Sequence, residues 1–228
     1  MSPSPTLQLR EEGQSLWLDY IRRRLLTSGD LQRLLDEDAL RGLTSNPAIF
    51  EQAIGGSDDY DEQIAELLEA APTLSAQDLY ERIAIDDIQR AADILRPVYD
   101  ETGVDGVVSF EVNPHLARDT EGTIEEARRL WEAVDRPNLM IKVPATEAGI
   151  PAIEQLLSEG INVNVTLMFS MEHYEQVAAA YVRGLEAADN PQGILSVASF
   201  FVSRVAREVD NRLEEKGLAG EVDFDGSD

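Results

Sequence analysis

The residue whose type and position most clearly indicate chemistry is Lys142, which lies between Ile141 and Val143 in a short apolar run. The run has β-strand character and is ended by Pro144. An ammonium group held away from water must find partners or lose its proton, and the second outcome leaves a nucleophilic amine. An amine of this kind can attack a carbonyl group and form a Schiff base.

Lysine is almost absent from the rest of the chain. The other lysine is Lys216, in a polar segment near the C-terminus, and arginine supplies nearly all the remaining positive charge. An ordinary alternative for Lys142 stays open: an edge-strand lysine whose stem packs on apolar neighbours while its head reaches water. The neighbouring elements must decide between a catalytic amine and a surface lysine.

The composition argues against several other kinds of chemistry. A chain of 228 residues can bury one substantial core, and a formal net charge of -25 argues against nucleic acid and anionic membranes as partners. The lack of cysteine excludes disulfides, thiol catalysis and cysteine metal sites. His115 and His173 have no partners at a metal-ligand spacing, and no glycine-rich nucleotide loop follows a strand. We expect neither a metal nor a cofactor.

The expected location follows from the apolar segments of the chain. No apolar run reaches the length of a membrane helix. Residues 1–10 lack the apolar region of a signal peptide. We therefore expect a cytoplasmic protein.

Strand and helix patterns alternate along most of the sequence. After an N-terminal extension at 1–13, expected to be flexible, an apolar segment contains Asp19. It is either an amphipathic helix that continues to Leu26 or a first strand that presents Asp19 at its end, and periodicity cannot decide. Further helices are expected at 30–40, 57–102 with a break near 71–75, 123–134, 148–159, 171–188 and 203–216. Further strands are expected at 41–47, running into a polar turn, at 103–114, around Lys142, at 161–169 and at 194–201.

This alternation favours an α/β fold of the TIM-barrel type, (β/α)8, over a dinucleotide-binding sheet. We expect residues 14–216 to form an incomplete barrel with about six of the eight strands, followed by an acidic tail at 217–228. The strand ends at one face of such a barrel supply the catalytic groups. Here those ends offer Asp19, Asn46, Glu111, Lys142, Thr166 and Ser199.

These residues lie in six short segments that follow one another along the chain. They are Leu18-Asp19, Thr44-Ser-Asn-Pro47, Val108-Ser-Phe-Glu-Val112, Ile141-Lys-Val-Pro-Ala145 with Gly149-Ile150, Asn162-Val-Asn-Val-Thr-Leu-Met-Phe-Ser170 and Ser196-Val-Ala-Ser-Phe-Phe-Val-Ser-Arg204. Each is weak alone. Together and in this order they resemble the transaldolase family, the class I enzymes that move a dihydroxyacetone unit between sugar phosphates.

The resemblance implies catalytic roles for four residues. Lys142 would form the Schiff base with the donor ketone, and Asp19 would act as general acid and base for carbon–carbon cleavage. Glu111 and Thr166 would hold a water for carbinolamine dehydration. Without the resemblance, Asp19 would be interpreted as a helix-surface carboxylate and Glu111 as a residue that caps the turn at Asn113-Pro114.

The resemblance also implies a binding site for sugar phosphates, with sedoheptulose 7-phosphate as donor and glyceraldehyde 3-phosphate as acceptor in the pentose phosphate pathway. Asn46 and Asn164 would hydrogen-bond the donor's hydroxyls, and Ser199 would lie near its terminal hydroxyl. Phe201 would form a wall, and Arg204 would bind phosphate. The alternative for Arg204 is a salt bridge with an acidic neighbour.

The sequence departs from the family at its C-terminal side. Phe201, in the sixth strand, lies 27 residues before the end of the chain, whereas two further strand–helix units need roughly 50 residues. A barrel without two strands exposes edges that invite aggregation or pairing with a second copy as a homo-oligomer. We expect this chain to be less stable and less active than its motifs imply.

Two other functions stay open. Fructose-6-phosphate aldolases share the lysine chemistry and release free dihydroxyacetone, but their lysine lies earlier and they lack the long insertion between the second and third strands. A non-catalytic, partner-dependent half-barrel is the second alternative.

The acidic composition supports the hypothesis of adaptation to high salt, because salt screens the self-repulsion that loosens a highly charged fold. We predict that the melting temperature rises when molar sodium chloride is added. Calorimetry over a salt series tests this, and a melting temperature that stays flat or falls contradicts the hypothesis.

Overall fold

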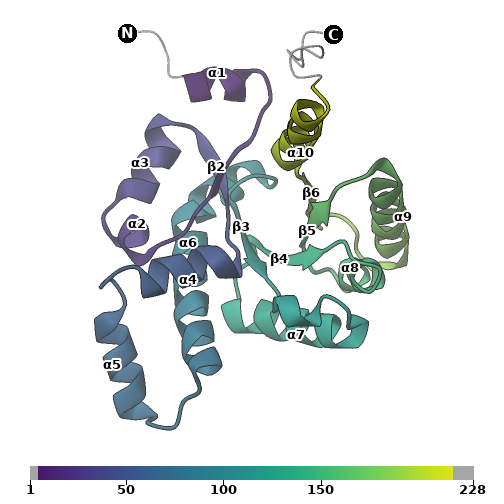
Figure 1. Cartoon of the computed structure of the whole chain (residues 1–228). Coiled ribbons are helices and arrows are strands. Elements are labelled where there is room, and N and C mark those ends of the chain that lie inside the picture. The colour runs from purple at the N-terminus through teal and green to yellow at the C-terminus, as the bar shows by residue number, and fades with distance from the viewer. Residues whose placement is uncertain (1–4, 218–228) are drawn as a thin grey trace.

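Six parallel strands form one sheet in the computed structural model, which describes residues 5–217 (Figure 1). The strands are β1 (Leu16–Asp19), β2 (Leu40–Thr44), β3 (Val107–Glu111), β4 (Leu139–Pro144), β5 (Val163–Met168) and β6 (Ser196–Phe200). Their order in the sheet is their order in the chain. This is the order of a (β/α) barrel, since a dinucleotide-binding sheet reverses its strand order. The prediction of a partial TIM-barrel fold is confirmed.

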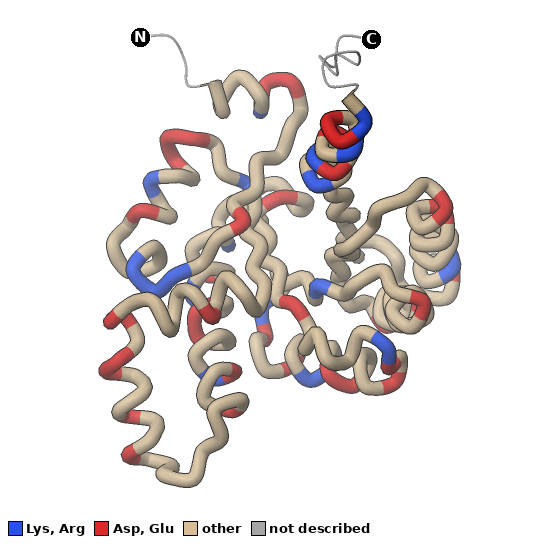
Figure 2. The backbone as a smooth tube through the Cα atoms, viewed as in Figure 1, with Lys and Arg blue, Asp and Glu red and all other residues tan. Residues whose placement is uncertain are grey.

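Helices lie around the sheet (Figure 1). They are α1 (Pro5–Glu11), α2 (Arg23–Thr27), α3 (Asp30–Glu37), α4 (Pro47–Gly55), α5 (Asp61–Ala70), α6 (Ala76–Thr102), α7 (Thr120–Val134), α8 (Gly149–Ser158), α9 (Met171–Ala187) and α10 (Val202–Glu215), with the 3-10 turn η1 (Pro114–Leu116). Acidic positions are distributed over these helices (Figure 2). Among residues 5–217, no helix is both long enough and apolar enough to span a membrane.

The structure resolves the ambiguity of the first apolar segment. Leu16–Asp19 is strand β1, and α2 begins four residues after Asp19 at Arg23. Within the extension expected at 1–13, Pro5–Glu11 form a helix with no buried residue. The predicted acidic tail lies outside the described residues except for Gly217.

Local capping signals define the insertion between β2 and β3. Ser75 is the N-cap of α6, as predicted, and its hydroxyl accepts a hydrogen bond from the Asp78 amide at 3.1 Å. Asn46 was predicted only as a strand end, but it caps α4, a helix that the sequence did not predict. Its side chain accepts a hydrogen bond from the Ile49 amide at 3.0 Å. Pro47 follows at the first helical position, where its missing amide hydrogen is not needed.

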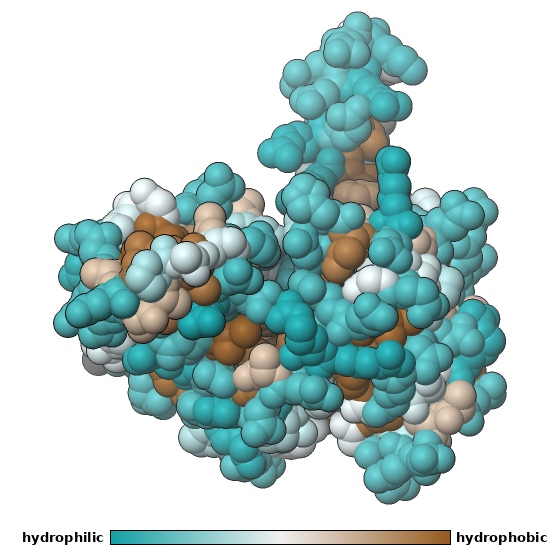
Figure 3. All heavy atoms as spheres, turned by 90° about the horizontal axis from the view of Figure 1, so that it is seen from below, coloured by the Kyte–Doolittle hydropathy of each residue, from teal (hydrophilic) through white to brown (hydrophobic). Residues whose placement is uncertain are grey.

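The middle of the sheet is buried, and its ends are open. Most residues of β3, β4 and β5 are buried, as expected for strands covered on both faces. Within residues 5–217, β1 pairs only with β2, and β6 pairs only with β5. Large apolar side chains near β6, including Phe169, Phe200 and Val202, are exposed. Figure 3 shows apolar patches between the hydrophilic side chains of one face.

Aromatic packing fixes β3 against the insertion. Phe50 of α4 is fully buried and contacts Tyr80 of α6 and Phe110 of β3 edge to face, at centroid distances of 6.0 and 6.2 Å. Phe110 directly precedes Glu111, so this packing also sets the carboxyl end of the strand. The three rings join α4, α6 and β3 in the main hydrophobic core.

We predict that Phe50→Ala lowers the free energy of unfolding by about 3–5 kcal/mol, because it removes a buried ring and leaves a cavity. Urea denaturation measures the loss. Val104→Ala, at a side chain that is 64% exposed, is the control and changes stability by less than about 0.5 kcal/mol. Equal effects of the two substitutions contradict the packing described here.

Candidate active site

Polar residues meet at the carboxyl ends of the central strands. The register pairs Glu111 with Lys142, Lys142 with Asn164, and Pro144 with Thr166. Paired residues of neighbouring strands project to the same face of a sheet. Three of the four predicted catalytic residues therefore share one face with Asn164.

Lys142 is buried at the centre of this group. The residue is 6% exposed, and its Nζ lies 3.2 Å from Oε2 of Glu111 and donates a hydrogen bond to the Ser45 carbonyl at 3.1 Å. Strand β4 is paired on both sides, by β3 and β5. The edge-strand alternative for Lys142 is therefore wrong, because its head is enclosed by protein groups.

Glu111 provides the negative charge that pairs with Lys142, and its side chain is largely buried. Burial raises the pKa of its carboxyl, the positive charge of Lys142 opposes that rise, and the charge of Asp19 adds to it. The turn that follows β3 is capped by another residue, since the Asn113 side chain accepts from the His115 amide at 3.0 Å. The turn-capping alternative for Glu111 is therefore wrong.

A chain of hydrogen bonds orients Asn164. Its side-chain amide donates to the Ser109 hydroxyl at 2.9 Å, and the Ser199 hydroxyl donates to its carbonyl oxygen at 2.9 Å. The Ser45 hydroxyl donates to the Ser109 carbonyl at 3.0 Å and ties the β2–α4 turn to β3. Sequence reasoning missed Ser45 and Ser109. The signal for Ser109 is its place two residues before Glu111, on the same face of an otherwise apolar strand.

Two threonine hydroxyls near this group are buried and have no hydrogen-bond partner within residues 5–217. They belong to Thr166 and Thr44, and Thr44 is paired in register with Asp19. A buried hydroxyl left without a partner costs about 1–3 kcal/mol, so such atoms are suited to bind a ligand. Thr44 was also missed by sequence reasoning, although it opens the Thr44-Ser-Asn-Pro47 segment.

Strand β5 leaves regular geometry directly after Thr166. Leu167 has φ +64°, in the left-handed region, and the pairing with β6 breaks between Val165 and Met168. A bulge of this kind redirects the side chains that follow it and is common beside active sites. Here it separates Thr166, which is buried, from the exposed Phe169.

Asp19 is the last residue of β1, and Asn46 lies two residues after the end of β2. Asp19 is exposed and forms no side-chain hydrogen bond or ion pair with the described part of the chain, and its charge acts on Glu111. It is a strand residue, so the helix-surface alternative is wrong. The Asn46 side-chain oxygen is used by the α4 cap, while its neighbour Ser45 provides the carbonyl that binds Lys142.

Phe201 and Arg204 form a separate group. Phe201 stacks on Phe169 at 5.5 Å, and the Arg204 guanidinium carbon lies 4.3 Å from the Phe201 ring centroid. Arg204 is exposed and has no ion pair within residues 5–217, so the predicted alternative of a salt bridge is not observed. In the same range, no hydrogen bond, ion pair or ring contact joins this group to Lys142.

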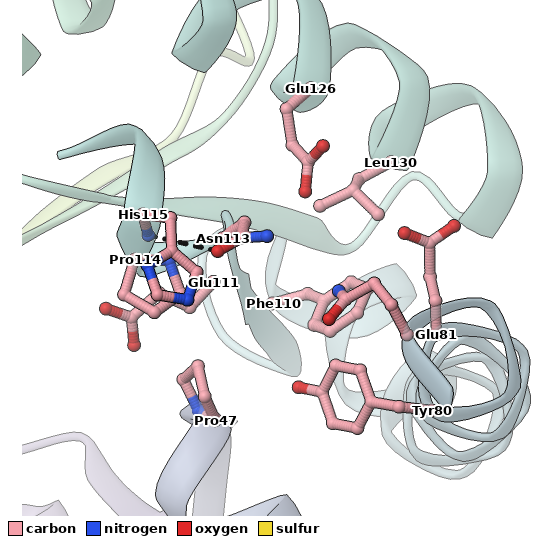
Figure 4. A pocket seen from close by; sticks show the side chains of 11 residues that line it. Pro47, Tyr80, Glu81, Phe110, Glu111, Asn113, Pro114, His115, Glu126 and Leu130 are labelled. Carbon is pink, nitrogen blue, oxygen red and sulfur yellow. Dashed lines mark hydrogen bonds between the residues drawn. The ribbon is translucent and has the colours of Figure 1, made fainter. Parts of the chain in front are cut away.

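A cavity of about 230 Å³ lies beside the lysine cluster, on the helix side of β3. Tyr80, Phe110, Glu111, Asn113 and His115 face it (Figure 4). Glu111 is the one predicted site residue that lines it, so this cavity is a neighbour of the lysine cluster. In the described range, no three His, Asp or Glu side chains are grouped so that they could hold a metal.

These observations define a parallel β/α barrel protein with a buried lysine among polar side chains at the carboxyl ends of its strands. Residues 16–226 match the sequence profile of the family described as transaldolase/fructose-6-phosphate aldolase. The chain belongs to this family.

Individual relatives in the family are close in sequence. The chain is 51% identical to "Transaldolase 1" of Streptomyces avermitilis over 215 residues, which cover 92% of this chain and 56% of the relative. It is 52% identical to "Transaldolase" of Thermobifida fusca over 217 residues, which cover 93% of this chain and 58% of the relative. The chain thus spans less than two thirds of the length of these relatives.

The direction of the Glu111 pKa can be measured by carbon-13 NMR titration of its carboxyl, identified by its loss in Glu111→Gln. We predict a pKa above the ordinary glutamate value in the wild type, because burial disfavours the charged form. In Lys142→Met the pKa rises further, because the charge that stabilises the carboxylate is removed. A pKa that falls in Lys142→Met contradicts the pairing of the two side chains.

Proposed function

We propose that this chain catalyses the transaldolase reaction, in which a dihydroxyacetone unit passes from a ketose phosphate to an aldose phosphate. One observation carries the proposal: the Lys142 amine is buried between the Glu111 carboxylate and the Ser45 carbonyl at the end of the central strand β4. A buried amine with a proton acceptor beside it is suited to nucleophilic attack on a ketone.

The first half of the reaction forms the imine. Lys142 first gives a proton to the neighbouring Glu111 carboxylate, and the free amine then attacks the ketone carbon of the donor, such as sedoheptulose 7-phosphate, and gives a carbinolamine. Loss of water from the carbinolamine gives the imine and needs both donation and removal of a proton. We assign these proton transfers to Glu111 and a water that it holds together with Thr166, whose hydroxyl is buried and has no partner in residues 5–217.

The second half breaks and remakes a carbon–carbon bond. Asp19 takes the proton of the hydroxyl next to the breaking bond, the bonding electrons move into the imine, and an enamine remains on Lys142 while the aldose phosphate leaves. The enamine then attacks the aldehyde carbon of the acceptor, such as glyceraldehyde 3-phosphate, and Asp19 returns a proton to its oxygen. Hydrolysis of the new imine frees Lys142 and the product ketose.

Substrate binding is assigned to the amides, a hydroxyl and the rim residues. Asn164, oriented by Ser109 and Ser199, would bind the hydroxyls of the dihydroxyacetone unit, and Ser199 would bind near its terminal hydroxyl. Asn46 would contribute its side-chain NH₂ group, which the α4 cap leaves available. Phe201 would form a wall of the pocket. Arg204, which has no ion pair within residues 5–217, would bind phosphate, a charge that the acidic surface otherwise repels.

Fructose-6-phosphate aldolase activity is the second candidate, because the matching family includes both reactions. The α4–α6 insertion between β2 and β3 favours the transaldolase, since the aldolases lack a long insertion there. Release of free dihydroxyacetone from a ketose phosphate without an acceptor distinguishes the two.

The setting of the reaction is part of the same proposal. Sugar phosphates are charged metabolites that do not enter the hydrocarbon core of a membrane, so the cytoplasm is the expected location. The proposed substrates belong to the pentose phosphate pathway. Pairing of the open β1 and β6 edges with a second copy remains the partner hypothesis.

Reduction with borohydride in the presence of sedoheptulose 7-phosphate tests the lysine chemistry. We predict that mass spectrometry finds a stable adduct on the peptide that contains Lys142 and none on the peptide that contains Lys216, which is exposed. Lys142→Ala abolishes the adduct. An unmodified wild-type chain, or an adduct on Lys216 alone, contradicts the proposal and favours a non-catalytic half-barrel.

A further inference from the structure

The segment that follows Asp19 is held by a polar network outside the candidate active site. Arg22 pairs with Asp59, and Asp59 also accepts from the Arg24 amide at 3.3 Å. Arg23, between them, directs its side chain to α5 and α6. Arg22 and the first two residues of α2 are thus bound to the insertion between β2 and β3.

Arg23 is the centre of the network. Its Nε donates to Asp87, and its Nη2 donates to the Gln63 side chain at 2.6 Å and lies 3.1 Å from Asp86. Its guanidinium carbon lies 5.1 Å from the centroid of the Tyr60 ring. The Arg23 backbone amide donates to the Tyr60 hydroxyl at 2.8 Å, and that hydroxyl donates to Asp87 at 2.9 Å.

The network is buried, so its geometry is strongly restricted. Tyr60 and Asp87 are both 0% exposed. Burial raises the pKa of the Asp87 carboxyl, while Arg23 and Tyr60 oppose that rise. A buried ion pair gives little net stability compared with apolar packing of the same volume, because desolvation offsets the attraction. What such a network does provide is a single backbone position for the residues that it binds.

The position of the Asp19 carboxylate depends on how firmly the backbone around it is held. Strand β1 pairs with β2 alone in the described residues, and the Asp19 side chain has no hydrogen bond or ion pair there. Its direction therefore depends on the backbone on its two sides. The pairing with Thr44 fixes one side, and the bound Arg23, four residues further on, fixes the other.

We propose that Arg23, Tyr60 and Asp87 are positioning residues that hold the Asp19 carboxylate at the reacting bond. This inference rests on the proposed function. It also gives a role to the insertion between β2 and β3, because its helices α5 and α6 bind the residues that follow β1. The network would act on carbon–carbon cleavage, the step assigned to Asp19, and leave imine formation on Lys142 unchanged.

Tyr60→Phe tests the inference, because it removes the hydroxyl that links the Arg23 amide to Asp87 and keeps the ring. We expect single-turnover release of the aldose phosphate from sedoheptulose 7-phosphate to slow by about tenfold or more, the order expected for a small misplacement of a catalytic group. The rate of borohydride-trapped imine on Lys142 stays within about twofold of the wild type. Tyr99→Phe, on the same helix as Asp87 and outside the network, leaves both rates unchanged.

A double variant separates positioning from a general loss of structure. If the network acts through Asp19, adding Tyr60→Phe to Asp19→Asn slows cleavage no further, because coupled residues are not additive. A general loss of structure gives additive losses and slows imine formation as well. Either of these results, or a cleavage rate in Tyr60→Phe equal to the wild type, overturns the inference.

The wild-type chain distinguishes the inference from the proposed function. Failure of the wild type to trap an imine on Lys142 contradicts the proposed function, and the positioning role falls with it. A wild type that traps the imine but releases no aldose phosphate leaves the lysine chemistry intact. It contradicts the transfer step of the proposed function, and the inference falls with it. A wild type that traps the imine and releases aldose phosphate, together with a Tyr60→Phe variant that keeps the wild-type cleavage rate, overturns the inference alone.

Discussion

The burial of one amino group constrains the rest of this fold. Removing a lysine head from water costs several kcal/mol unless charged or polar partners compensate. For Lys142 the partners come from two other segments, Glu111 at the end of β3 and the Ser45 carbonyl in the β2–α4 turn. The ends of β2, β3 and β4 must therefore keep a fixed relation, which six strands in chain order provide.

The surrounding structure can be understood as support for those strand ends. Phe50 packs α4 and α6 against β3 one residue before Glu111, and the α4 cap at Asn46 sets the turn that presents the Ser45 carbonyl. The buried network around Arg23 holds the end of β1 in the same way. Rigid elements and buried contacts thus position the catalytic candidates, as an active site requires.

The sequence predicted the elements better than the contacts. The apolar run around Lys142 and the Ser75 cap are local signals, and both predict the observed structure because few other structures satisfy them. The sequence places Asn46 at a strand end and does not identify it as a helix cap, because Asn-Pro is compatible with both. The Ser45 carbonyl cannot be predicted from the sequence, because every residue has a backbone carbonyl and the residue type does not indicate which one binds Lys142. Ser109 was missed because its partner Asn164 lies 55 residues away in sequence.

The enclosure of the Lys142 amine is the central claim, and the presence of only two lysines makes it measurable. A proton–nitrogen correlation spectrum of lysine-labelled protein separates the two Nζ groups. We predict one Nζ signal with slow solvent exchange, absent in Lys142→Met and faster to exchange in Glu111→Gln. The exposed Lys216 supplies the fast reference. If both Nζ groups of the wild type exchange at the same fast rate, Lys142 is open to solvent and this account is contradicted.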